Sequence, residues 1–191
     1  MLLCVNGTGI LNRWLQKFIV EGATYDDMNE MANEAPIGAD GLSFIPFGNG
    51  AERIMENNDI GAKISGLNFN RHNQSHIIRA GHEGIVFALN YGFNIMKEMG
   101  MELKTIRAGH ANMFLSPLFS EAFANIASVT VELYNTDGAQ GAARGAGIGA
   151  GVYNNYGEAF RSLKSIKTIE PSPTLFGAYE DAYENWLKNL T

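Results

Sequence analysis

Hydrophobic residues recur with a helical period along several stretches of this chain. The longest stretch predicts a helix from His76 to Met99, ended by Gly100, because glycine commonly follows the last turn of a helix. A second pattern predicts a helix that is capped by Thr8 and runs to about Ile19. Further helices are predicted over 25–33, started by Thr24 or Asp26, from the turn at Gly109 to about Ala127, over 137–153, and after the proline-marked loop that begins at Thr168.

Short apolar runs between turn residues predict the strands. They cover 2–5, 42–47, 64–70, 103–107 and 129–133, with turn chemistry at 35–42 and an irregular loop at 48–63. Strands that alternate with helices indicate an α/β domain built in layers.

Composition and charge narrow the classes of function. With 46% hydrophobic residues, the 191-residue chain has enough apolar side chains for a core. The net charge of −6, without a lysine- and arginine-rich stripe, argues against nucleic acid as a partner. No apolar run reaches the ~20 residues that cross a bilayer, and no basic leader is present. The single cysteine, Cys4, is typical of a cytoplasmic protein, and opening directly on a strand indicates a piece of a longer chain.

Glycine is the unusual residue of the sequence, at 22 positions. Within 135–153, Gly141, Gly145 and Gly149 recur every four residues, which places a ridge without side chains along one helix. Each glycine costs a helix up to ~1 kcal/mol relative to alanine. A compensating contact is therefore expected, either with another helix or a sheet, or with the flat ring of a ligand.

The segment NGTG (6–9) places a glycine-rich turn before a predicted helix. Backbone N–H groups at a helix start can bind phosphate. Four residues without the lysine of a P-loop are nevertheless a weak pattern, and a tight turn capped by Thr8 is the favoured interpretation.

The histidines give no specific catalytic pattern. His72 and His76 have a spacing that can share a metal on one helix face, but no cysteine or carboxylate completes a familiar ligand set. Surface and capping roles are favoured for both. His82 and Glu83 are neighbours in the longest helix, where a satisfied buried pair is favoured over an acid–base pair.

The segment RAGHANMFLSPLF (107–119) ends a predicted strand on a turn of small residues. A glycine turn between a strand and a helix places backbone N–H groups beside a phosphate or a ribose. Asn112 carries donors and acceptors, so it suits a purine edge or a ribose hydroxyl. The alternative is that Asn112 caps the following helix.

Together, these motifs resemble the nucleotide-binding end of the FGGY carbohydrate kinases. The similar segments follow the family order and cover essentially the whole chain: DGLSFIPFGNGAER (40–53), AKISGLNFNRHNQSHIIRAGHEG (62–84) and RAGHAN…SPLF…FANIASVTVELYNTDGAQGAARGAG (107–147). NGTGILNRWL is similar to the helix that follows the family's phosphate-binding hairpin, and not to the hairpin itself. The xylulokinase branch is the most similar in overall pattern.

This resemblance implies an α/β fold of the actin-like ATPase, ribonuclease H-like class, with a mixed sheet flanked by helices. Residues 1–191 would form the C-terminal, nucleotide-binding lobe. Full-length members transfer the γ-phosphoryl group of ATP to a sugar hydroxyl, with Mg²⁺, in a cleft between two lobes. The sugar, here D-xylulose, and the carboxylate base would belong mainly to the other lobe. This lobe would hold most of the ATP or ADP in the complete enzyme, but alone it would be inactive and would bind nucleotide weakly or not at all. A homodimer is the candidate assembly.

The resemblance also assigns residues. Gly109, His110, Asn112, Gly138 and Gly141 match the positions that the family places beside the nucleotide.

Other positions depart from the family pattern. Ala108 replaces the first glycine of the turn, and His110 replaces a small residue. Gly81 and His82 replace an apolar pair before Glu83.

Two other interpretations remain. A non-catalytic actin-like assembly module would expose a long apolar patch. A small-ligand enzyme unrelated to kinases would use His82 and Glu83 as acid and base.

Overall fold

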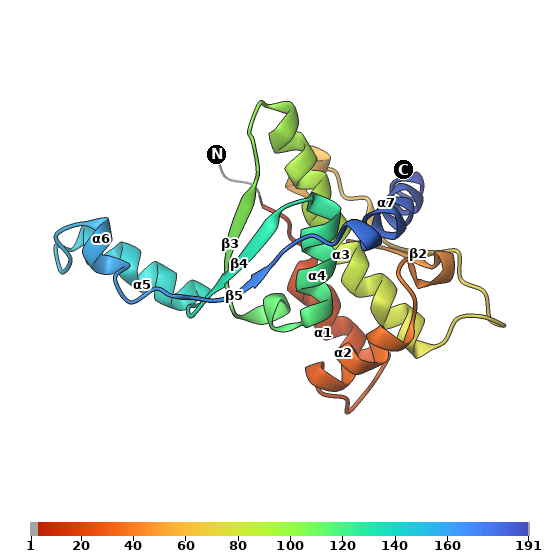
Figure 1. The fold of residues 1–191 in the computed structure, drawn as a ribbon. Coiled ribbons are helices and arrows are strands. Elements are labelled where there is room, and N and C mark those ends of the chain that lie inside the picture. Colours follow the sequence, from red (N-terminus) through yellow and green to blue (C-terminus); the bar gives the residue numbers. More distant parts are fainter. Residues whose placement is uncertain (1–3, 191) are drawn as a thin grey trace.

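The computed structural model describes residues 4–190 (Figure 1). Its α-helices are α1 (Thr8–Phe18), α2 (Tyr25–Glu34), α3 (Gln74–Glu98), α4 (Pro117–Ala127), α5 (Gly138–Gly149), α6 (Tyr156–Ala159) and α7 (Pro173–Lys188). Short 3-10 helices are η1 (Ala39–Gly41), η2 (Arg53–Met55) and η3 (Asn112–Leu115). The strands are β1 (Ser43–Phe47), β2 (Gly61–Ser65), β3 (Thr105–Gly109), β4 (Thr130–Tyr134) and β5 (Ser165–Ile169).

Helix α3 forms the centre of the fold and packs against α1, α2, α4 and strand β1 (Figure 1). The predicted helix is confirmed, and it begins two residues early because the side chain of Asn73 accepts a hydrogen bond from the N–H of His76. Gly84 lets α3 lie directly on β1, since an added Cβ would overlap the carbonyl oxygen of Phe44. This close packing fixes the helix that forms the floor of the cleft described below.

A three-stranded mixed sheet lies beside the helices. Strand β4 is its centre and pairs in parallel with β3 and antiparallel with β5. The sequence predicted the first two strands, shifted by one or two residues, and missed β5. Because only Ile169 of β5 is even partly buried, that strand lacks the apolar pattern from which strands are predicted. The α/β class with a mixed sheet flanked by helices is confirmed.

Strands β1 and β2 form an antiparallel hairpin. The predicted strand at 42–47 is confirmed, with every residue of β1 buried. The strand predicted at 64–70 is wrong, because β2 covers Gly61–Ser65 and so also interrupts the loop predicted at 48–63. Gly61 and Gly66, with φ of 70° and 79°, bound the strand in the left-handed region that favours glycine.

The N-terminal helices begin in different ways. Helix α1 starts at Thr8 itself, one residue earlier than predicted. Thr8 is therefore not its cap, because Gly7 occupies that position and offers no side-chain hydrogen bond. Gly7 is required by packing, since an added Cβ would overlap the carbonyl oxygen of Pro46. In α2, Thr24 forms a capping box with Asp27, as one of the two predicted caps. Residues 4–6 form no strand, and the rest of the strand predicted at 2–5 lies outside the described residues.

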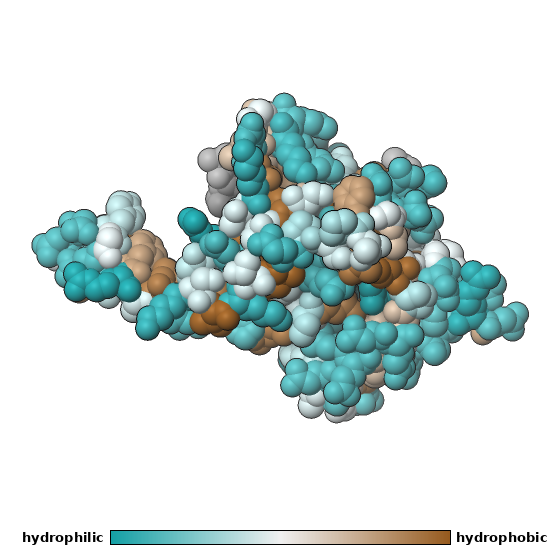
Figure 2. Space-filling view, viewed as in Figure 1, coloured by the Kyte–Doolittle hydropathy of each residue, from teal (hydrophilic) through white to brown (hydrophobic). Residues whose placement is uncertain are grey.

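Helices α5 and α6 project from the body as an arm (Figure 1). Helix α5 ends at Gly149 instead of the predicted Tyr153, and none of its residues is buried. Open space surrounds Gly141, Gly145 and Gly149, so the predicted packing of the glycine ridge against a helix or sheet does not occur within residues 4–190. Figure 2 shows apolar surface on this arm.

The C-terminal helix α7 is amphipathic, as predicted. It buries Tyr179, Tyr183 and Trp186, and the indole N–H of Trp186 donates to the carbonyl oxygen of Phe44 over 3.0 Å. None of the helices between residues 4 and 190 combines the length and the apolar character that crossing a membrane requires.

Candidate functional site

A cleft of about 1180 Å³ is bounded by several parts of the fold. The starts of α1 and α2, the end of β3 with η3, and the starts of α4 and α5 line it, and α3 supplies the floor. Ile85, Leu89, Phe93 and Met96 give this floor an apolar surface, because they recur at helical spacing on α3. An apolar floor with polar groups at its edges is typical of a small-molecule site.

Two of the predicted site residues, Gly109 and Gly138, meet in one wall of the cleft. An added Cβ at Gly109 would lie 2.5 Å from the carbonyl oxygen of Thr136 and 3.4 Å from Cα of Asp137. Gly109 therefore allows the end of β3 to touch the turn that leads into α5. Gly138 is the first residue of α5, and Asp137 caps that helix by accepting a hydrogen bond from the N–H of Gln140 over 2.8 Å.

Asn112 also lines the cleft, on the same side as Gly109. Its backbone has a φ of 53°, a left-handed conformation that asparagine tolerates better than most residues. The alternative prediction, that Asn112 caps the following helix, is wrong. The cap of α4 is Ser116, whose hydroxyl accepts from the N–H of Phe119 over 3.2 Å.

The other two predicted residues lie outside the lining of the cleft. The N–H of His110 donates to the carbonyl oxygen of Tyr134 over 2.8 Å, which continues the pairing of β3 with β4. Gly141 lies on the arm, one turn beyond Gly138, with open space beside it. The structure thus brings Gly109, Asn112 and Gly138 together and leaves these two at the margin.

Thr8 and Gly9, at the start of α1, also line the cleft. The glycine-rich turn before this helix was the available signal, but the sequence favoured a purely structural role for it. Packing against Pro46 does explain Gly7. However, Gly7 has no side chain to cap α1, so the first-turn N–H groups of this helix have no capping side chain at the point where they face the cleft.

His82 and Glu83 do not form an acid–base pair. His82 lies on the cleft side of α3, where its Nε2 is 3.0 Å from Oδ1 of Asn12. Glu83 points to a different neighbourhood and accepts a hydrogen bond from Nε of Arg79 over 2.6 Å and others from the N–H of Gly38. The small-ligand enzyme that would use this pair therefore has no support in the geometry.

The stability of the fold is expected to fall as the pH drops from 6.5 toward 4 because of His82. Burial lowers the pKa of His82 to about 4, with a smaller contribution from the charge of Arg79. The unfolded chain takes up this proton near pH 6.5, so acid favours unfolding inside that window and has no effect through His82 above it. Between pH 7.5 and pH 5, urea unfolding should show the wild type losing about 2 kcal/mol more than His82→Leu. Equal losses in the two proteins would mean that another group is responsible.

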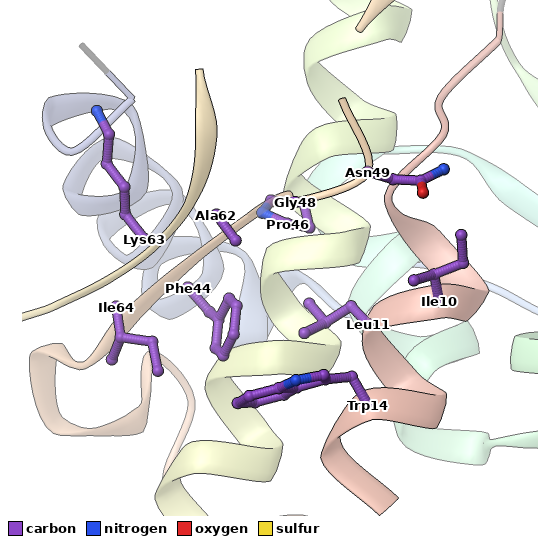
Figure 3. A pocket seen from close by; sticks show the side chains of 10 residues that line it. All are labelled: Ile10, Leu11, Trp14, Phe44, Pro46, Gly48, Asn49, Ala62, Lys63 and Ile64. Carbon is purple, nitrogen blue, oxygen red and sulfur yellow. The ribbon is translucent and has the colours of Figure 1, made fainter. Parts of the chain in front are cut away.

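A second hollow, of about 340 Å³, lies between α1 and the β1–β2 hairpin (Figure 3). Trp14 and Ile10 of α1 face Phe44 and Ile64 across it. Trp14 is 39% exposed and Ile10 is 53% exposed, so apolar surface reaches solvent here. This groove lacks the converging polar groups that fix a nucleotide, and it is the kind of surface that the assembly-module interpretation predicts.

The histidines near the N-terminus of α3 have structural roles. The ring of His76 takes part in the capping box with Asn73, as favoured from the sequence, and its Nε2 lies 3.3 Å from Oδ2 of Asp40. Within the described part of the chain, no three histidine, cysteine or carboxylate side chains converge as metal ligands.

Comparisons with known sequences give a consistent family assignment. Residues 4–153 match the model of the FGGY family of carbohydrate kinases, C-terminal domain. The chain is 28% identical over its whole length to a xylulose kinase of Haemophilus influenzae, of which it covers 38%. It is also 27% identical, over 85% of its length, to the L-xylulose/3-keto-L-gulonate kinase of Escherichia coli, of which it covers 32%. The chain thus spans less than two-fifths of the length of these relatives.

Solved structures show the same fold. A ligand-bound xylulose kinase from Lactobacillus acidophilus superimposes with a TM-score of 0.82 at 22% identity, over 97% of this chain and 38% of that one. A glycerol kinase from Plasmodium falciparum with ADP gives a TM-score of 0.76 at 22% identity, over 97% of this chain and 37% of that one. These likenesses confirm the predicted actin-like α/β fold.

Proposed function

The chain belongs to the FGGY family of carbohydrate kinases as a C-terminal domain, and from this premise we propose that it is the nucleotide-binding lobe of an ATP-dependent sugar kinase. Enzymes of this family are phosphotransferases. Under the proposal, residues 1–191 form one lobe, and the sugar and the catalytic carboxylate belong to another. The 38% coverage of the Haemophilus relative is consistent with a second lobe of greater length.

The observation that carries the proposal is the convergence of backbone segments around the cleft. Gly109 and Gly138 meet in one wall of the cleft, and the uncapped start of α1 at Thr8 lines the same cleft. Helix starts present N–H groups and a favourable dipole to anions, and α3 offers an apolar floor for a flat ring. Phosphoryl transfer depends mainly on positioning and on charge stabilisation, which suits a lobe with few charged side chains at its site.

ATP or ADP would therefore lie in this cleft, between that wall and the start of α1. Gly109, Asn112 and Gly138 keep their proposed roles beside the nucleotide, and Thr8 with Gly9 joins them. His110 and Gly141 lie on the adjoining backbone and would act only by shaping the end of β3 and the start of α5.

Mg²⁺ fits this arrangement as a partner of the phosphates. The cleft holds two carboxylates, Asp26 and Asp137, and the second already accepts a hydrogen bond from Gln140 as a helix cap. Mg²⁺ in kinases is usually bound by one or two carboxylates, water and the phosphates themselves, so no all-protein cage is needed. When bound, the ion would neutralise the charge that develops on the transferred phosphoryl group.

Xylulose is the proposed sugar, since two of the sequence relatives phosphorylate xylulose according to their names. A gluconokinase of Bacillus subtilis is 32% identical over 49% of the chain, which makes gluconate the next candidate. The residues that determine specificity for the sugar would lie mainly in the other lobe.

The full-length gene product is expected to phosphorylate a ketose in the presence of ATP and Mg²⁺. A coupled assay for ADP release, run with D-xylulose, L-xylulose, D-gluconate and glycerol, identifies the acceptor. The 191-residue chain alone is expected to form no sugar phosphate and to bind ADP weakly or not at all in a thermal-shift titration. Failure of the folded full-length product with every sugar would contradict the kinase assignment. Robust turnover by the isolated chain would contradict the proposal that another lobe is needed.

A non-catalytic assembly module is the second candidate. The groove at Trp14 and the open glycine ridge of α5 are exposed surfaces on which a partner would pack. Self-association of the full-length product without any sugar kinase activity, measured by analytical ultracentrifugation, would favour this alternative.

A further inference from the structure

A polar pair joins α1 to α3 at the cleft. His82 is 1% exposed and its Nδ1 is buried without a hydrogen-bond partner among the described residues. Its Nε2 lies 3.0 Å from Oδ1 of Asn12, and both residues line the cleft. An unpaired buried nitrogen is unfavourable, so packing alone gives no reason for a histidine where an apolar side chain would fill the space.

The hydrogen bond fixes the orientation of the Asn12 amide. Because burial keeps the pKa of His82 near 4, the ring is neutral at pH 7 and carries one proton. A proton on Nδ1 would be a buried donor without a partner, so the proton is on Nε2 and is donated to Oδ1 of Asn12. The amide nitrogen Nδ2 is then the group that Asn12 has left to offer, and it donates to no other residue in the range 4–190.

Asn12 lies on the same face of α1 as the first turn. Thr8 precedes it by one helical turn and Gly9 by three residues, and all three line the cleft. Since Gly7 supplies no capping hydrogen bond, the first-turn N–H groups are also unclaimed by a side chain. Backbone donors and the amide of Asn12 therefore form one set of donors along this side of the cleft.

We propose that Asn12 is a further ligand-binding residue, whose amide N–H group donates to an oxygen of the phosphate chain of a nucleotide, and that His82 is the positioning residue that holds the amide in this orientation. The inference rests on the proposed function, because it takes a nucleotide as the ligand of the cleft. Phosphate is favoured over the ribose or the base because the neighbouring donors belong to a helix start, where the dipole favours negative charge.

Asn12→Asp in the full-length gene product tests the ligand contact. The aspartate keeps an oxygen for the N–H of His82 but replaces the donor with a negative charge. The KM for ATP and the inhibition constant of ADP are expected to rise at least about tenfold, whereas the inhibition constant of adenosine changes by less than about twofold. Asn12→Ser, which is uncharged and too short to span the same distance, should show the same selectivity if the aspartate variant does not fold.

Two variants of His82 test the positioning role. His82→Leu fills the space without a donor and is expected to raise the KM for ATP about three- to tenfold. His82→Gln places an amide N–H near the position of Nε2 and is expected to recover most of that loss. If His82 had only a packing role, His82→Leu would raise the KM for ATP less than His82→Gln, because the apolar side chain of leucine suits a buried space better.

The outcomes separate the inference from the proposed function. Unchanged KM and inhibition constants in the folded Asn12 variants would overturn the phosphate contact. Equal weakening of ADP and adenosine by His82→Leu, or no recovery with His82→Gln, would overturn the positioning role. A wild-type product that binds neither ATP nor ADP would instead overturn the kinase assignment, and the inference with it.

Discussion

Replacing Arg79 with methionine is expected to lower the free energy of unfolding by about 3–5 kcal/mol, since it leaves the buried carboxylate of Glu83 without its ion-pair partner. Nε of Arg79 lies 2.6 Å from Oε1 of Glu83, and their side chains are 7% and 2% exposed. The same guanidinium donates to the hydroxyl of Tyr179 and to the carbonyl oxygen of Ala35. One substitution therefore removes links from α3 to α7 and to the turn after α2, as well as the charge partner.

The double variant Arg79→Met with Glu83→Gln is the matched control for this prediction. Glutamine keeps an oxygen for the N–H of Gly38 but removes the uncompensated charge, so the double variant should recover a large part of the lost stability. Urea unfolding followed by circular dichroism gives both values. A loss below about 1 kcal/mol for Arg79→Met would show that the pair adds little to the fold, as exposed ion pairs do.

The elements that could be predicted from the sequence are those whose burial follows a regular period. The core face of α3 repeats with a helical period, and β1 is apolar from Phe44 to Phe47, so both were located within about two residues. Strand β5 has almost no buried residue, and β2 is only half buried along alternate positions. Such strands are defined by their hydrogen-bonded neighbours, which are distant in the sequence and leave no local pattern.

The candidate site was predictable to a similar degree. Gly109, Asn112 and Gly138 were selected from turn chemistry and family resemblance, and the fold places them on one cleft. The contact between Asn12 and His82 joins residues 70 positions apart, so no local sequence pattern predicts it. The sequence predicts that glycine at position 109 allows a ligand to approach the backbone closely. The structure gives a second reason for glycine there, because a side chain would overlap the carbonyl oxygen of Thr136.

Replacing Gly109 with valine is expected to have the largest effect on nucleotide binding. Its Cβ would lie 2.5 Å from the carbonyl oxygen of Thr136, which is backbone and cannot rotate away. The turn at 136–138 must then move away from β3, which displaces Gly138 and the start of α5 on the same wall of the cleft. Overpacking of this kind costs about 1–3 kcal/mol. Because the displaced turn weakens the nucleotide-bound state by this amount, the KM for ATP is expected to rise about 10- to 100-fold.

Gly145→Ala provides the control for Gly109→Val, because it also adds a side chain to a glycine but does so on the arm, with open space around it and outside the cleft. That variant should keep the KM for ATP and gain up to about 1 kcal/mol of helix stability. Steady-state kinetics of the full-length product, with ATP varied at saturating sugar, measures both variants. Gly109→Ala should fall between the wild type and Gly109→Val, since its single methyl group already meets the same carbonyl oxygen. An unchanged KM in a folded Gly109→Val protein would remove Gly109 from the nucleotide site, and with it the wall on which the proposed placement of ATP depends.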